Sequence, residues 1–259
     1  LVNHWWNVPL YVSTRGLTTT AMPYEGIFFE MEFDFLEHQL RIRCSNGSNT
    51  SVALEPKSVA TFYKQTMAAL EDLNLKIHIW PMPVEVPSPI RFDEDTEHQS
   101  YDAEYVQRFW HILSMADRVL QQFRARFIGK SSPVHFFWGS FDLAVTRFSG
   151  RPAPPRPEAD LITREAYSHE VISHGFWPGQ GPLGKPSFYS YTAPAPEGLS
   201  EAQVRPASTS YNKDMSLFLL LYDDVRKAKD PEDTLMQFLQ STYEAGASLA
   251  GWDRKALER

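Results

Sequence analysis

Apolar and polar residues alternate along the first third of the chain, which is typical of antiparallel β-strands. In IFFEMEFDF (27–35) one face carries Phe29, Met31, Phe33 and Phe35, and the opposite face carries the acidic residues. A turn near Glu37 leads into QLRIRC (39–44), and further strands are predicted at 9–14, at the threonine-rich run 17–20 and at KIHIW (76–80). A strand with one apolar and one charged face predicts a sheet that is covered on one side only.

Apolar residues recur with helical spacing in three longer segments. The spacing predicts a helix over 57–73 that Pro56 introduces, and a long helix from about Asp102 to Phe127. A last helix begins at Asp230 and Pro231, because aspartate caps a helix N-terminus and proline fits its first turn.

The second half of the chain adds predicted strands at 134–148, near 166–174, at 187–193 and at 216–222. As one continuous strand, 136–148 places Trp138, Ser140 and Asp142 on one face, with His135 and Arg147 on the other. A strand over 165–173 places Tyr167, His169 and Ser173 on one face. A helix capped by Thr163 and ended by Gly175 is the alternative for this segment.

Proline-rich passages mark the predicted surface excursions. PMPVEVPSP (81–89), followed by the acidic DEDTEH (93–98), separates two sub-halves, 1–87 and 101–259, and RPAPPRP (151–157) is a second passage. The fold class that follows is α+β, a mostly antiparallel sheet with long helices packed on it, in a single domain over 1–259. The apolar segment NHWWNVPLYV (3–12) is expected as a strand of the main sheet.

Composition narrows the class of protein. With 259 residues and 42% hydrophobic content the chain can bury a sizeable core, and its net charge of -7 argues against a nucleic-acid partner. The single cysteine, Cys44, excludes an internal disulfide and fits a cytoplasmic location, and no apolar run reaches the ~18 to 20 residues of a membrane span. The sequence does not determine the oligomeric state.

The candidate functional residues are polar groups set among aromatic ones, because buried polar groups must find partners or a ligand. Asp142, His169 and Ser140 are the candidate catalytic residues. The candidate ligand-binding residues are Trp138, Tyr167, Trp177, Tyr189, Arg147 and Arg15. The pattern favours a small-molecule enzyme with hydrolase-like or lyase-like acid/base chemistry and no organic cofactor. The alternative is a non-catalytic binding protein for an aromatic or anionic amphipathic ligand, held by Arg147 and Arg15.

Two apparent motifs fail on their spacing. GKSS (129–132) lacks the earlier glycine of a phosphate-binding loop, and HEVISH (169–174) has one residue too many for a zinc-binding helix. A metal held by His4, His135 and His169 stays an open alternative that no spacing supports, and no metal site is predicted.

Four stretches resemble a known family: NHWWNVPLYVSTRGLTT (3–19), SPVHFFWGSFDLAVTRFSGRPAP (132–154), REAYSHEVISHGFWPG (164–179) and QSTYEAGASLAGWDRKALE (240–258). Together they make the chain similar, nearly end to end, to the bacterial family of unknown function DUF5996. The resemblance implies a single full-length unit with a further segment before Leu1. It implies no activity and no catalytic residue.

Overall fold

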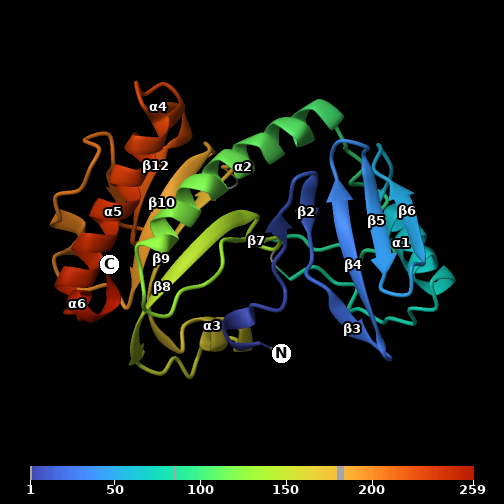
Figure 1. The fold of residues 1–259 in the computed structure, drawn as a ribbon, viewed down its shortest axis with the longest axis horizontal. Coiled ribbons are helices and arrows are strands. Elements are labelled where there is room, and N and C mark those ends of the chain that lie inside the picture. The colour runs from blue at the N-terminus through green and yellow to red at the C-terminus, as the bar shows by residue number, and fades with distance from the viewer. Residues whose placement is uncertain (1, 85, 180–183) are drawn as a thin grey trace. The chain divides into compact units, whose positions relative to one another are not determined.

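The computed structural model describes residues 2–84, 86–179 and 184–259, and its helices and antiparallel sheets confirm the α+β class (Figure 1). The chain forms two compact units, Leu10–Ser114 and the remainder, which joins the residues up to Pro9 to Met115–Arg259. The division falls inside helix α2 (Ala103–Ala125), so it differs from the sub-halves expected from the proline-rich passage.

The unit Leu10–Ser114 holds an antiparallel sheet in the order β1-β2-β4-β5-β6, with β3 paired to β4. Its strands are β1 (Tyr11–Val12), β2 (Gly16–Thr18), β3 (Met22–Tyr24), β4 (Ile27–Asp34), β5 (Gln39–Cys44) and β6 (Asn49–Ala53). Met31 pairs with Ile42 and Phe33 with Leu40, which confirms the predicted hairpin of β4 and β5.

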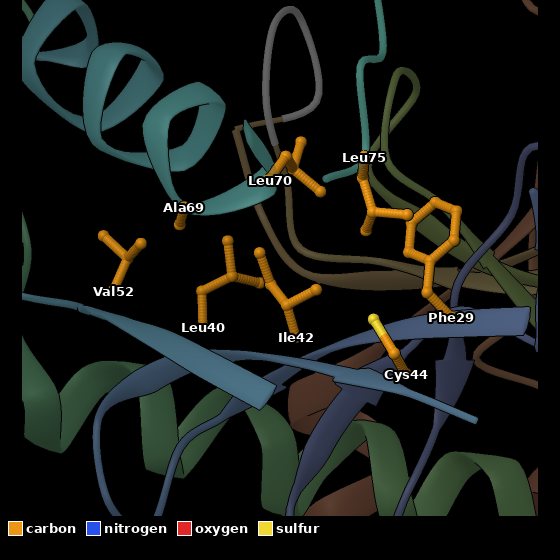
Figure 2. Close-up of a cluster of buried hydrophobic side chains, with 8 residues drawn as sticks. All are labelled: Phe29, Leu40, Ile42, Cys44, Val52, Ala69, Leu70 and Leu75. Atoms are coloured by element: carbon orange, nitrogen blue, oxygen red, sulfur yellow. The ribbon is translucent and has the colours of Figure 1, made fainter. Parts of the chain in front are cut away.

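Helix α1 (Val59–Asp72) covers one face of this sheet. Ser58 caps the helix by accepting a hydrogen bond from the backbone N–H of Thr61. Figure 2 shows the apolar side chains that meet between helix and sheet: Phe29, Leu40, Ile42, Cys44, Val52, Ala69, Leu70 and Leu75. Cys44 therefore belongs to the core, as its small apolar side chain allows.

The opposite face of β4 carries a buried ion-pair network. Asp34 has no exposed side-chain surface and accepts hydrogen bonds from Arg15 at 2.7 Å and Arg41 at 2.8 Å. Arg43 lies 3.0 Å from Glu32 in the same way. The acidic residues of this strand are therefore paired beneath arginines instead of fully solvated.

The other unit holds an antiparallel sheet in the order β11-β12-β10-β9-β8-β7. Its strands are β7 (His135–Phe137), β8 (Asp142–Pro152), β9 (His169–Trp177), β10 (Ser187–Ala193), β11 (Ser210–Asn212) and β12 (Leu217–Leu221). α5 (Pro231–Leu249) begins as predicted, with Asp230 as cap and Pro231 in its first turn. The short helices are η1 (Asn3–Trp5), α3 (Leu161–Ala166), η3 (Leu199–Glu201), α4 (Tyr222–Arg226) and α6 (Arg254–Leu257).

One face of this second sheet is covered by α5 and by the C-terminal part of α2. Phe123 of α2 lies edge-on against His174 of β9, with ring centroids 4.7 Å apart, and Thr242 of α5 lies 3.2 Å from His174 Nε2. Arg147 of β8 lies over the rings of Phe123 of α2 and Tyr243 of α5, so both helices pack on the same face. We call this side the helix face.

Three predicted strands are wrong. Residues 76–80 are not in a strand, and 3–8 form η1 and a turn, so only Tyr11 and Val12 of the N-terminal segment enter a strand. The segment 134–148 is a hairpin, because 138–141 form a turn between β7 and β8. Periodicity alone does not show which strand, if any, a short apolar run pairs with, so it does not place such a run in a sheet.

The segment 161–177 contains both a helix and a strand, the two structures that the sequence offered as alternatives here. Helix α3 is capped by Asp160, whose side chain accepts from Thr163 N, and β9 follows from His169 through Gly175. Thr163 therefore lies inside helix α3 and does not cap it. Gly175 lies inside strand β9 and does not end a helix.

The first proline-rich passage lies outside both sheets, as predicted. Val84 and residues 86–89 are exposed, whereas Pro81 is buried and 82–83 are half-buried, and residue 85 lies outside the described residues. The second begins within β8, since Pro152 pairs with His169 at the end of that strand. Only 153–157 run outside the sheet. In the part of the chain that the structure describes, no helix is long and apolar enough to cross a membrane.

Candidate functional site

The β7–β8 hairpin decides which side chains share a face of the second sheet. Asp142 pairs with Phe137 and Ala144 with His135, so the turn reverses the alternation that a continuous strand would have. His135 therefore lies on the face of Asp142, and not on the face of Arg147 as expected from a single strand. We call this side, opposite the helix face, the polar face.

Asp142 is the central carboxylate of the polar face. It is 8% exposed, and its two oxygens accept hydrogen bonds from the hydroxyls of Ser140 and Tyr189. Burial raises the pKa of the Asp142 carboxyl, while the bonds from Ser140 and Tyr189 act in the opposite direction. Among the described residues no lysine, arginine or histidine forms an ion pair with Asp142, so its charge is stabilised by the two hydroxyl donors and by the backbone N–H of Asp142 itself.

Gly175 allows Tyr189 to reach Asp142. Tyr189 on β10 pairs with Gly175 on β9, and Gly175 pairs with Ala144 on β8. A Cβ at Gly175 would overlap the Tyr189 phenol and the carbonyl oxygen of Leu143. The glycine thus opens a path across β9 along which the phenol lies.

A chain of hydroxyl groups continues along the polar face from this point. Tyr167 donates to the Tyr191 hydroxyl at 3.0 Å, and the hydroxyls of Thr146 and Ser173 lie 2.9 Å apart. The rings of Tyr189 and Tyr191 are stacked with centroids 6.0 Å apart. Burial raises the pKa of both phenols well above the ordinary tyrosine value, so both groups act as neutral hydroxyls.

The turn that presents Ser140 is strained. Phe141, directly after Ser140, has φ 60°, a left-handed conformation that a bulky side chain rarely adopts. Ser140 is exposed, and Trp138 in the same turn is 51% exposed with its indole N–H donating to Val8 O at 2.9 Å. Strained backbone of this kind concentrates at functional sites.

His169 does not join Asp142 and Ser140. It pairs with Pro152 at one end of β9, whereas Phe176, which pairs with the neighbour of Asp142, lies at the other end. Seven residues of strand separate these positions, which is about 23 Å at roughly 3.3 Å per residue. The His169 ring lies near Ser168 Oγ, at 3.1 Å, and near the His4 ring, with centroids 5.7 Å apart.

The two arginines expected to hold an anion are engaged by other groups of the protein. Arg147 is on the helix face, 1% exposed, with its guanidinium stacked over Phe123 and Tyr243 and donating to the Phe123 carbonyl. Arg15 belongs to the other compact unit, where it pairs with Asp34. Of the expected aromatic residues, Tyr167 and Tyr189 enter the hydroxyl chain, and Trp177 is the half-buried last residue of β9.

The histidines do not form a metal site in the described part of the chain, where no group of three or more His, Cys, Asp or Glu side chains could hold an ion. His135 is 1% exposed, and burial together with Arg124 lowers its pKa to about 4. A neutral imidazole in such a place packs as a core side chain against Trp6 and Phe137.

Sequence reasoning missed three residues of the polar face: Gly175, Tyr191 and Lys130. An isolated glycine inside a strand is a signal of close approach by another side chain, so Gly175 was open to detection. No sequence pattern marks Tyr191 or Lys130. Tyr191 joins the polar face through its strand register, and Lys130 through the residues that lie next to it in space.

Comparisons with known proteins place the whole chain in one family. The sequence profile of a family described as a family of unknown function, DUF5996, matches residues 1–259. No curated protein and no solved structure matches the chain.

Proposed function

This chain belongs to the DUF5996 family, and we propose from the geometry around Asp142 that it is a small-molecule enzyme that uses acid/base chemistry without an organic cofactor. The observation that carries the proposal is the buried carboxylate of Asp142, which pairs with no cationic side chain of the described residues and accepts a hydrogen bond from the exposed hydroxyl of Ser140. A carboxyl whose pKa burial raises can exchange a proton at moderate pH.

The reaction that fits this geometry is acyl transfer from an ester or a related carbonyl compound. Asp142 takes the proton of the Ser140 hydroxyl while Oγ forms a bond to the carbonyl carbon, whose π electrons move onto its oxygen. As that oxygen re-forms its double bond, the leaving group departs and takes the proton from Asp142. A water that gives a proton to Asp142 then attacks the acyl-serine, and the proton returns to Ser140 Oγ.

Tyr189 acts in this scheme as a positioning residue. Its hydroxyl donates to the second oxygen of Asp142 and leaves the first oxygen toward Ser140. The neighbouring aromatic side chains, Trp138 and Tyr191, present partly exposed apolar surface that suits a substrate with a hydrophobic part.

The test uses a fluorophosphonate probe, which reacts with nucleophilic serines, and a panel of p-nitrophenyl esters of increasing acyl length. We expect probe attachment at Ser140 and ester hydrolysis that falls by about 100-fold or more in Ser140→Ala and in Asp142→Asn. Tyr189→Phe should reduce kcat less, and Ser200→Ala, a change of a serine on η3, serves as the matched control.

The proposal fails if the parent protein neither hydrolyses the esters nor reacts at Ser140. Denaturant unfolding of Ser140→Ala and Asp142→Asn completes the test, because members of a structural network lose roughly 1 to 3 kcal/mol when a buried partner is left unsatisfied. A large loss of stability in both variants without any turnover in the parent would make the group a structural network.

A non-catalytic binding protein is the second candidate, favoured by the fact that both oxygens of Asp142 already have donors within the protein. Stacked Tyr189 and Tyr191 would then contact an aromatic or amphipathic ligand. Saturable binding of an aromatic metabolite that Tyr191→Ala weakens, with no turnover of any ester, would favour this function.

The location and partners that we propose are a reducing cytoplasm and a small-molecule ligand, with no nucleic acid and no membrane. Support comes from the net charge of -7 and from a single cysteine that is buried and free.

A further inference from the structure

A second group of titratable side chains lies at the far end of the polar face from Asp142. Lys130 Nζ lies 2.9 Å from His4 Nε2 and stands over two aromatic rings, 4.9 Å from the centroid of Phe148 and 5.3 Å from that of Trp6. The ring of His169 completes the group, with its centroid 5.7 Å from that of His4. All of these residues belong to one compact unit.

The hydrogen bonds of His4 define its tautomer. Its Nδ1–H donates to the carbonyl of Ala166 at 3.4 Å, and its Nε2 accepts from the ammonium of Lys130. The ring is therefore neutral, and its one lone pair faces a cation. This arrangement disfavours a bound metal ion, because the nitrogen that would ligate it already faces a positive charge.

The backbone at His4 and Trp5 is conformationally strained. His4 has φ 59° and Trp5 has φ 61°, so two consecutive residues with side chains adopt the left-handed conformation. The His4 side chain is nevertheless 5% exposed and lies against the ring of Phe148, with centroids 4.7 Å apart. Such strain is typical of positions that the surrounding structure holds for a purpose.

The group carries positive charge without a matching acid. Within the described ranges no carboxylate lies in ion-pair distance of Lys130, and Glu165 contacts His4 through the backbone N–H of His4, at 3.4 Å. Trp6 and Phe148 stabilise the ammonium through their π faces but do not neutralise it. A cationic group in such surroundings attracts an anion.

Donors remain available for that anion. Lys130 is exposed, and its ammonium has two further N–H groups beyond the one that His4 accepts. His169 is half-buried, and its Nδ1 is engaged by Ser168 Oγ, so its Nε2 is the nitrogen left to meet a ligand.

We propose that Lys130, His4 and His169 form a binding site for a small oxyanion, a phosphate or a carboxylate group. The anion accepts hydrogen bonds from Lys130 Nζ and His169 Nε2. His4 Nε2 positions the ammonium by accepting a hydrogen bond from it. This site is separate from Asp142 and does not depend on the proposed enzymatic activity.

Isothermal titration of the whole 259-residue chain with inorganic phosphate, and separately with acetate, tests the site. We expect saturable binding of at least one anion. Lys130→Gln and His169→Gln should each weaken it by about tenfold, which corresponds to about 1.4 kcal/mol. Lys130→Arg, which keeps the charge, should retain most of the affinity. Stronger binding of phosphate assigns a phosphorylated ligand, and stronger binding of acetate a carboxylate.

Two controls separate this site from other effects. Lys229→Gln, a change of an exposed lysine elsewhere in the same unit, and Asp142→Asn should both bind the anion like the parent. Thermal unfolding confirms that each variant is folded. Failure of both anions to bind the parent, or equal binding by folded Lys130→Gln, would overturn the proposal.

NMR titration of His4 provides a readout that is independent of affinity. Burial, Lys130 and His169 together lower the pKa of His4 in the anion-free protein, and hydrogen bonds to the backbone of Ala166 and Glu165 act in the opposite direction. A bound anion must raise this pKa, because it stabilises the imidazolium. An unchanged pKa of His4 in saturating phosphate and in saturating acetate would contradict the site.

Discussion

The hydroxyl of Tyr189 donates a hydrogen bond to the carboxylate of Asp142, although a complete strand lies between the two residues. Tyr189 is on β10 and Asp142 on β8, and the phenol crosses the intervening strand β9 over Gly175. The absence of a single Cβ atom therefore decides whether the buried carboxylate has its second donor.

The substitution Gly175→Ala should break this arrangement. The new methyl group overlaps the Tyr189 phenol and the Leu143 carbonyl, so we expect a loss of about 1 to 3 kcal/mol in the free energy of unfolding. Urea unfolding measures it. A double-mutant cycle with Tyr189→Ala should show a coupling of about 1 kcal/mol, since removing the ring removes part of the overlap. Additive effects would mean that the ring does not lie over Gly175.

The buried histidine His135 should make stability depend on pH in the mildly acidic range. Burial and Arg124 lower its pKa from 6.5 to about 4, so the unfolded chain binds the proton more readily than the folded protein. The free energy of unfolding is then highest above about pH 6.5. It decreases by roughly 3 kcal/mol as the pH falls toward 4.

His135→Phe should reduce this slope relative to the parent. Urea unfolding at a series of pH values makes the comparison. The buried His174, whose pKa burial also lowers, leaves a residual slope in the variant. An identical pH profile in parent and His135→Phe would show that His135 does not resist protonation.

Asp34 should control the stability of the protein at lower pH. Burial would raise its pKa, but hydrogen bonds from Arg15, Arg41 and two backbone N–H groups lower it from 3.8 to about 2. Because the folded-state pKa lies below the unfolded one, the stabilisation is present above about pH 4 and is lost as the pH falls through 2.

Lowering the pKa of Asp34 from 3.8 to about 2 corresponds to about 2 to 3 kcal/mol of stability, and Asp34→Asn should remove that amount at neutral pH. Acid titration followed by circular dichroism tests it against Asp72→Asn, a change of an exposed carboxylate at the end of α1 in the same unit. The role of Asp34 is refuted if both variants unfold at the same urea concentration as the parent.

Arg147 should contribute to stability and not to anion binding. Its guanidinium lies 3.5 Å from the centroid of Phe123 and 4.2 Å from that of Tyr243, and burial lowers its pKa to about 10. Lysine cannot reproduce a planar stack, so Arg147→Lys should lower the free energy of unfolding by about 2 to 3 kcal/mol. Phosphate titration of the folded variant should match the parent. If the variant binds phosphate more weakly and its free energy of unfolding is unchanged, Arg147 belongs to a ligand-binding site instead.

The sequence by itself determined the elements whose signal is local. The helices α1, α2 and α5 and the hairpin of β4 and β5 follow from apolar periodicity and from caps such as Asp230, which act within a few residues. The α+β class follows from them, as does the idea that polar residues near Asp142 lie among aromatics.

Only the tertiary structure decided which of those polar residues meet. One turn at 138–141 reverses the alternation of the strand and moves His135 to the face of Asp142, away from that of Arg147. Strand register places Tyr189 across β9 from Asp142 and keeps His169 about 23 Å away along β9, at roughly 3.3 Å per residue. The pairing of Lys130 with His4 joins residues 126 positions apart in the chain. Such contacts depend on register and chain reversal, which no local pattern of residues encodes, because each residue's partner is chosen by the packing of the whole sheet.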